Sequence, residues 1–258
     1  MIQKYFRLIW MFLMLCLCSC ALQQASGVAR DVYPEKRILS TSGGLAEEDV
    51  FQALAKIDFK TVDASYHVRA ALVLRRPGYV RLEVLPLIGN PDLLLTATPD
   101  TMTVFVPSKK ELYRGRPTRS NLEKFLPWSM DIEDMVLVLT GTYPFCTTER
   151  LAEDVSSEGR LWRMTCKKSS SESQIIWVQE GSQKLMRLLC TDETGSEKYN
   201  VQYFYGGQSA LPEKLVIRLA NGSTALTVTY SDVRVEKTKD LSVFNLTAPS
   251  DVEQNILE

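Results

Sequence analysis

Three thiols crowd into the stretch LMLCLCSCALQQ, residues 13–24, at Cys16, Cys18 and Cys20. Thiolates bind zinc or act as nucleophiles, so the cluster raises the question of a metal site. A zinc site needs a second group of ligands at a suitable spacing, and the whole chain has a single histidine, His67. We therefore expect neither a metal site nor a cofactor.

His67 is also the only imidazole that could serve as a general base. It shares one face of a predicted strand with Arg69, which favours a solvent-exposed side chain. The sequence has no Gly-x-Ser-x-Gly motif, no Walker loop and no metal-spaced set of His and Cys residues. We expect that the protein is not an enzyme.

The residues before the cysteines have the layout of a secretory signal peptide. Lys4 and Arg7 make a short basic region, and residues 8–17 are an almost continuous apolar run. A membrane-spanning helix needs about 20 apolar residues. The run from Leu8 to Leu22 gives 15, so a signal anchor is the less favoured alternative.

The sequence Leu17-Cys18-Ser19-Cys20 resembles the bacterial lipobox. The resemblance implies that the Cys20 thiol accepts a diacylglycerol group and that cleavage removes residues 1–19. Several acyl chains anchor a protein firmly, because each buried methylene adds about 0.8 kcal/mol. Residue 21 is Ala rather than Asp, which by resemblance to enterobacterial sorting indicates the outer membrane, with the protein facing the periplasm. The inner membrane remains the alternative.

The mature chain would have 239 residues, enough for one sizeable domain. It would carry 28 basic and 31 acidic residues, a balance that gives no sign of a nucleic-acid surface. Besides the lipidated Cys20, its cysteines are Cys146, Cys166 and Cys190. Three cysteines in an oxidising compartment allow one disulfide and one free thiol, but they also fit three small buried side chains.

Residues 20–44 lack periodicity and end in Ser42-Gly43-Gly44, so we expect a flexible tether after the lipidated cysteine. Residues 45–57 place Leu45, Val50, Phe51, Leu54 and Ile57 close to helical spacing, which predicts a helix. From residue 63 onward the apolar period is two. This pattern predicts about eleven strands over residues 64–76, 79–86, 92–99, 101–107, 110–115, 161–168, 173–180, 184–192, 198–206, 212–220 and 223–235.

Residues 118–141 interrupt the strands. Ser120 and Glu123 fit a capping box, and Asp131 is placed to cap a second helix that Gly141 would end. We therefore predict a mainly β (α+β) fold: one curved antiparallel half-barrel with a few helices covering its concave face. The change of phase near Asp232 predicts a bulge or a strand end there.

One face of the predicted sheet is apolar and must be covered. If the helices at 120–140 fill the concave side, these residues form a core; if the helices fall short, they line an acyl-chain pocket. The candidate lining residues are Leu72, Leu74, Leu82, Val84, Leu93, Leu95, Val104, Met135, Leu139, Leu226 and Val228.

Two stretches resemble the LolA/LolB lipoprotein-localisation family, and LolB-like outer-membrane receptors in particular. They are VRLEVLPLIGNPDLLLTATPDTMTVFVPSKKELYRG at 80–115 and DIEDMVLVLTGTYP at 131–144, and the tail VFNLTAPSDV at 243–252 resembles LolA-like endings. The resemblance implies a half-barrel domain over residues 45–258 that holds the acyl chains of lipoproteins. It also implies a protruding loop at Leu87, and Ile88 is an insertion in that loop; the alternative is that both fold back into the core.

We therefore predict an outer-membrane lipoprotein that would receive lipoprotein acyl chains from a periplasmic LolA-like carrier. We expect it to be a monomer. Another lipid as cargo is an alternative. A second alternative is an assembly or scaffold lipoprotein whose sheet binds proteins through residues 145–200, with Trp162 and Trp177.

Overall fold

The computed structural model describes residues 44–258 apart from 129, 144–146, 157–158, 170, 208, 221, 223 and 248, and it describes only the backbone of 147–156 and 159. The predicted signal peptide, Cys20, the tether up to residue 43 and Cys146 lie outside the described residues. Among the helices described, none is long and apolar enough to cross a membrane.

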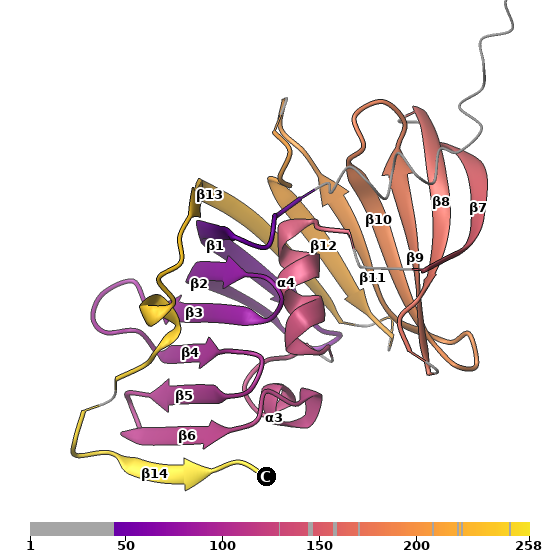
Figure 1. Cartoon of the computed structure of the whole chain (residues 1–258). Coiled ribbons are helices and arrows are strands. Elements are labelled where there is room, and N and C mark those ends of the chain that lie inside the picture. The colour runs from indigo at the N-terminus through magenta and orange to yellow at the C-terminus, as the bar shows by residue number, and fades with distance from the viewer. Residues whose placement is uncertain are drawn as a thin grey trace, which may run out of the picture. The chain divides into compact units, whose positions relative to one another are not determined.

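The described chain builds one open sheet of fourteen strands, in the order β14-β6-β5-β4-β3-β2-β1-β13-β12-β11-β10-β9-β8-β7 (Figure 1). Two antiparallel meanders, β1–β6 and β7–β13, join where β1 pairs with β13. The first meander comprises β1 (Asp49–Lys60), β2 (Ser65–Arg75), β3 (Tyr79–Leu85), β4 (Leu93–Ala97), β5 (Met102–Val106) and β6 (Glu111–Gly115). The second comprises β7 (Thr147–Ser156), β8 (Gly159–Lys167), β9 (Glu172–Gln179), β10 (Leu185–Asp192), β11 (Glu197–Phe204), β12 (Lys214–Leu219) and β13 (Ala225–Lys237).

The expected curved, mainly β sheet is confirmed, with three strands more than the pattern predicted. These are β1, β7 and a short β14 (Glu253–Ile256), which pairs with β6 in parallel while the other neighbours are antiparallel. The bulge expected near Asp232 is also confirmed. The register between β1 and β13 shifts at Gln52/Leu54, opposite residues 231–234, and Asp232 has φ of 52°.

The helix predicted over residues 45–57 is wrong, because most of this segment is strand β1. Phe51, Ala53, Ala55 and Ile57 are buried at alternate positions, which is the period of a strand. The strand hydrogen-bonds on both sides, to β2 and β13. This central position in the sheet overrides the helix propensity of its Ala, Leu and Lys residues.

Two short helices lie over the sheet between the meanders (Figure 1). Helix α3 (Arg119–Glu123) is capped by Thr118, whose hydroxyl accepts from the Asn121 amide, and not by Ser120 as predicted. Helix α4 (Ile132–Thr140) has Asp131 at its N-cap position and ends at Gly141 in the left-handed conformation, as predicted. We refer to α3 and α4 as the lid helices.

After β13 the chain continues through the short 3₁₀ helix η2 (Ser242–Phe244) and ends in β14. The cysteines follow one of the two expected arrangements. Cys166 is disulfide-bonded, whereas Cys190 is a free, buried thiol. Burial raises the pKa of Cys190 to about 11, so this thiol is unreactive at neutral pH.

Candidate functional site

The candidate site is the apolar concave face of the sheet together with the lid helices. Nine of the predicted lining residues are at most 2% exposed: Leu72, Leu74, Leu82, Leu95, Val104, Met135, Leu139, Leu226 and Val228. The other two, Val84 and Leu93, are partly buried and pack against the same cluster. The structure thus brings all eleven residues into one hydrophobic cluster.

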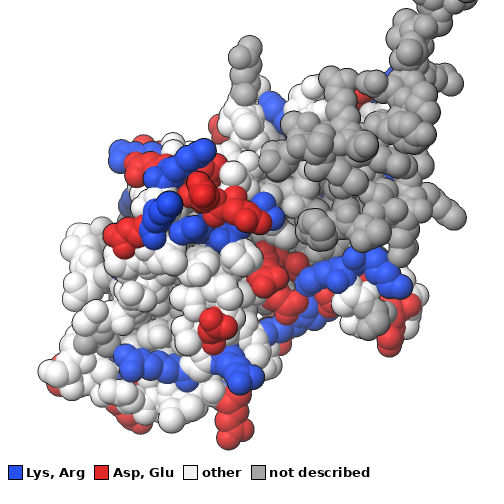
Figure 2. Space-filling model, in the orientation of Figure 1, with Lys and Arg blue, Asp and Glu red and all other residues white. Residues whose placement is uncertain are grey.

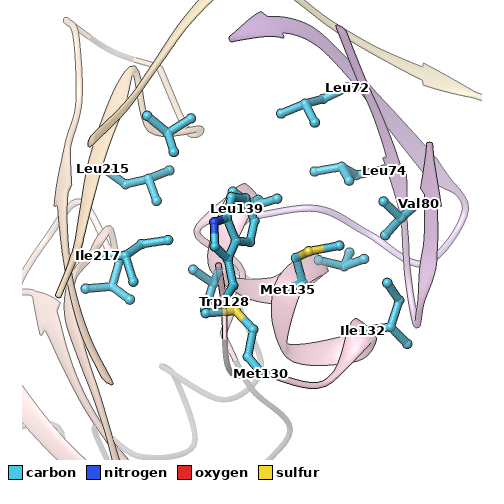
Figure 3. Close-up of a cluster of buried hydrophobic side chains, with 14 of the residues drawn as sticks. Leu72, Leu74, Val80, Trp128, Met130, Ile132, Met135, Leu139, Leu215 and Ile217 are labelled. Carbon is cyan, nitrogen blue, oxygen red and sulfur yellow. The ribbon is translucent and has the colours of Figure 1, made fainter. Parts of the chain in front are cut away.

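The lid helices and the segment between them fill this face. Trp128, Met130, Ile132, Met135 and Leu139 lie between the strand residues of the two meanders (Figure 3) and are at most 4% exposed. A side chain with no exposed surface has no water-sized void against it. Among the described residues, the concave face is therefore a closely packed core.

Part of this core comes from strands β8–β12, which the sequence prediction placed correctly but did not assign to the site. The alternation that revealed Leu226 and Val228 is equally present in β8–β12. The additional core residues include Met164, Ile176, Val178, Leu188, Val201, Tyr203, Leu215 and Ile217.

The first turn of α4 is bound to the second meander by ion pairs, one of which includes a buried carboxylate. The Lys168 ammonium lies 2.7 Å from the Asp134 carboxylate and 2.8 Å from that of Asp131. Asp134, which is 2% exposed, also accepts hydrogen bonds from Tyr199 Oη at 3.1 Å and Gln174 Nε2 at 3.4 Å. A buried carboxylate persists only when it is paired and hydrogen-bonded in this way.

Glu172 extends these contacts to α3 and β11. Its carboxylate lies 3.3 Å from Lys168, accepts from Arg119 at 2.9 Å and is paired with Lys198. We call Arg119, Asp131, Asp134, Lys168, Glu172 and Lys198 the ion-pair network. Its three cations balance its three carboxylates.

The pKa values reflect this balance. Burial would raise the pKa of Glu172, but the Lys198 and Arg119 contacts outweigh burial and lower it to about 2. Burial would lower the pKa of Lys168, but Asp134 and Asp131 outweigh it and raise that pKa. Glu172 and Lys168 are therefore both charged around neutral pH.

The donor set of Asp131, Asp134 and Glu172 has oxygens within 4.8 Å of one another, as in a divalent-cation site. The Lys168 ammonium already lies within 3.3 Å of all three carboxylates. The geometry is that of a satisfied ion-pair network.

The other end of α4 is held by hydroxyl groups. Tyr230 Oη donates to the Leu139 carbonyl at 2.7 Å, and the Thr140 and Thr142 hydroxyls lie 2.7 Å apart. Thr142 Oγ1 accepts from the Leu45 amide at 2.8 Å. Polar contacts thus fix both ends of a helix whose middle is apolar.

The loop between β3 and β4 extends from the ends of these strands, at the left of Figure 1. Leu87 is 91% exposed and Ile88 is 94% exposed, so the alternative in which they fold into the core is wrong. Val62 in the turn between β1 and β2 is 77% exposed, and the strand register places this turn at the same end of the sheet. Exposed aliphatic side chains gathered at one edge are typical of a contact surface.

The remaining candidates are His67, Trp162 and Trp177. His67 is exposed and pairs with Asp58 across β1 and β2. Trp162 packs against the concave core. Trp177 lies between Arg163 and Arg187 on its neighbouring strands, whose guanidinium carbons are 5.8 and 4.6 Å from the centre of its ring. Charged groups of both signs are interspersed on the face seen in Figure 2.

The fold defines a class of protein, an open curved sheet covered by lid helices, and solved structures share it. A domain from Vibrio parahaemolyticus described as outer membrane lipoprotein-sorting has a TM-score of 0.55 and 12% identity, covering 78% of this chain and 90% of that one. A LolA superfamily protein from Nitrosomonas europaea has a TM-score of 0.56 and 14% identity, covering 82% of this chain and 97% of that one.

A DUF1329 family protein from Desulfovibrio piger has a TM-score of 0.58 and 12% identity, covering 81% of this chain and 93% of that one. No family model and no curated protein matches the sequence. The chain therefore has a LolA-like fold.

Proposed function

We propose that this protein is an envelope lipoprotein that binds acyl chains under its lid helices and takes part in localising lipoproteins to the outer membrane. The observation that carries the proposal is the concave face itself, whose apolar residues come from both meanders and are separated only by two short helices. The LolA-like fold and the lipoprotein-sorting description of one structural neighbour support it.

Because the face is packed, an acyl chain must displace lid side chains to bind. The apolar surface lost by the lid would be replaced by the chain, at about 25 cal/mol per Å² in either direction. The cost of opening then lies mainly in the ion-pair network and the Tyr230 and Thr142 contacts. Binding is expected to open α4 as a unit while the sheet stays in place.

The anchor at Cys20 would hold this domain at the periplasmic face of the outer membrane. A periplasmic LolA-like carrier would deliver the acylated lipoprotein, and a tenfold bias in favour of transfer needs only about 1.4 kcal/mol. Leu87 and Ile88 would enter the bilayer during release, since both are almost fully exposed. The process requires no catalysis, cofactor or nucleic acid, and the protein would act as a monomer.

A fluorescent fatty acid titrated into residues 21–258 tests the proposal, with displacement by a triacylated lipopeptide and, separately, by a phospholipid. Saturable binding displaced by the lipopeptide alone supports a lipoprotein receptor. Displacement by the phospholipid as well would change the cargo to another lipid.

A second candidate function is an envelope scaffold that binds protein partners on the sheet. The observation that favours it is the packing of the concave face, where Leu74, Leu95, Val104 and Leu139 have no exposed surface. Absence of saturable probe binding would favour this function over acyl binding.

A further inference from the structure

The outer, convex face of β3–β6 is covered by the end of the chain. Arg81 on β3 donates to the Val243 carbonyl at 2.9 Å, and Phe244 is 2% exposed with its ring 5.4 Å from that of Tyr79. Farther on, Lys110 pairs with Asp251 at 2.8 Å, and β14 then pairs with β6. We call residues 242–257 the C-terminal strap.

A small cavity of about 140 Å³ remains between the strap and the strands. This volume accommodates a group of several non-hydrogen atoms. It is lined by Thr96, Thr98, Thr101, Thr103, Arg114, Phe244, Asn245 and Leu246. The lining thus combines four threonines with a cation and contains no acidic residue.

Several polar groups in this cavity have no partner. Thr96 is 3% exposed, yet among the described residues its hydroxyl makes no hydrogen bond. The Thr103 hydroxyl, directly opposite Thr96 in the strand register, and the Arg114 guanidinium are likewise unpaired within the part of the chain that the structure describes. Thr96 is the buried residue of this set, Thr103 is partly buried and the Arg114 side chain is exposed. A buried hydroxyl normally has a hydrogen-bond partner, so Thr96 indicates a missing partner in the cavity.

The neighbouring cations, unlike Arg114, are paired with carboxylates. Arg81, which pairs with Thr96 in the strand register, lies 2.6 Å from Glu83 and also donates to the strap. Lys110 is paired with Asp251. Arg114 is the cation of the cavity lining, and no carboxylate neutralises it there.

We propose that this cavity binds a small oxyanion of the phosphate type. A guanidinium recognises such a group with charge-assisted hydrogen bonds, and hydroxyl groups donate to its remaining oxygens. Asn245 on the strap offers a further donor, so the ligand bridges the sheet and the C-terminal strap. The oxyanion is either free phosphate or the phosphate of a lipid headgroup.

The proposal is tested by titrating the protein with inorganic phosphate and, separately, with glycerol phosphate as a headgroup probe, while recording NMR shifts and the thermal unfolding midpoint. A half-buried site of this kind is expected to bind with a Kd of about 1 mM. Stronger binding of glycerol phosphate would indicate a lipid headgroup, and equal binding would indicate free phosphate.

Two variants separate binding from folding. Arg114→Gln is expected to weaken phosphate binding about tenfold, because it removes a charge-assisted contact. Thr96→Val keeps the shape of the side chain and removes an unpaired hydroxyl, so it should weaken binding without lowering the unfolding midpoint. Arg234→Gln, which alters an exposed arginine on β13, is the matched control and should bind as the parent does.

The proposal is overturned if the parent protein shows no saturable response to either anion. It is also overturned if Arg114→Gln and Arg234→Gln bind equally, because the response would then arise from general surface charge. A stability loss in Thr96→Val with unchanged binding would show that the hydroxyl has a structural role only.

Discussion

Helix α4 meets the two meanders of the sheet in different ways. Toward β2 and β3 it presents Ile132 and Met135, which lie opposite Leu74 and Val80 (Figure 3). Toward the second meander its first turn presents Asp134, which is paired with Lys168. One helix is thus packed by apolar contact on one side and fixed by charge on the other.

This difference bears on how the lid could open. Apolar contacts are non-directional, so an acyl chain could replace the helix with little net change in buried apolar area. Ion pairs depend on geometry and are lost when one partner moves. In the proposed function, the apolar side would supply the binding surface, and the charged side would supply the position and the barrier.

The largest expected effect is that of Lys168→Ala, which leaves Asp134 buried without its cation. We expect a loss of about 4 kcal/mol in the free energy of unfolding, measured by urea denaturation. Lys167→Ala, at an exposed neighbouring residue, is the control. Replacing both partners, with Asp134→Leu and Lys168→Met, should recover most of the loss. Equal losses in the Lys168 and Lys167 variants would contradict the role of the network.

On the apolar side, Leu139→Ala creates a cavity at a fully buried position. The expected loss in the free energy of unfolding is about 3 kcal/mol. Leu137→Ala, at a less buried position on the same helix, should cost clearly less. Thermal or urea unfolding measures both. Similar small losses would show that α4 packs loosely.

Acid should weaken the charged side selectively. The pKa of Glu172 falls from 4.5 to about 2 on folding, so its contribution is complete above pH 4.5 and is lost as the pH falls toward 2. Glu172→Gln should therefore be less stable than the parent at neutral pH, and the difference should shrink across this window. Urea midpoints at successive pH values measure it, with the exposed Glu180→Gln as control. A difference that is independent of pH would contradict the assignment.

The smallest effect on stability is expected at the exposed loop. Leu87→Ser with Ile88→Ser should change the free energy of unfolding by less than about 0.5 kcal/mol, because neither side chain is packed. The same variant should bind phosphatidylethanolamine and phosphatidylglycerol vesicles more weakly in a flotation assay. Val233→Ser with Val235→Ser is a matched control, because these valines are exposed at the opposite end of β1. Equal vesicle binding by both variants would refute membrane insertion by the loop.

Much of the fold was predictable from local pattern. Alternating residues revealed most strands, and Asp131 with Gly141 delimited α4. Segment 45–57 was assigned incorrectly, because its spacing fits both periods and its place between β2 and β13 decides the outcome.

The state of the site was not predictable. Whether the lid fills the concave face depends on how side chains fit in three dimensions. The ion-pair network joins residues from 119 to 198 and has no local pattern. One signal was present: Asp134 falls on the apolar face of α4, where a carboxylate needs a buried partner.

The most direct test of the account is to lock α4 against the sheet. In the structure a Cβ at Gly78 would lie 3.4 Å from Glu133 Cγ, so Gly78→Cys with Glu133→Cys can form a disulfide across the lid. Acyl-probe binding is then measured in the oxidised and reduced variant, with the parent protein under the same two conditions to control for the disulfide at Cys166. The account predicts no binding when the lock is oxidised and parental binding when it is reduced. Equal binding in both states would show that acyl chains do not enter beneath α4.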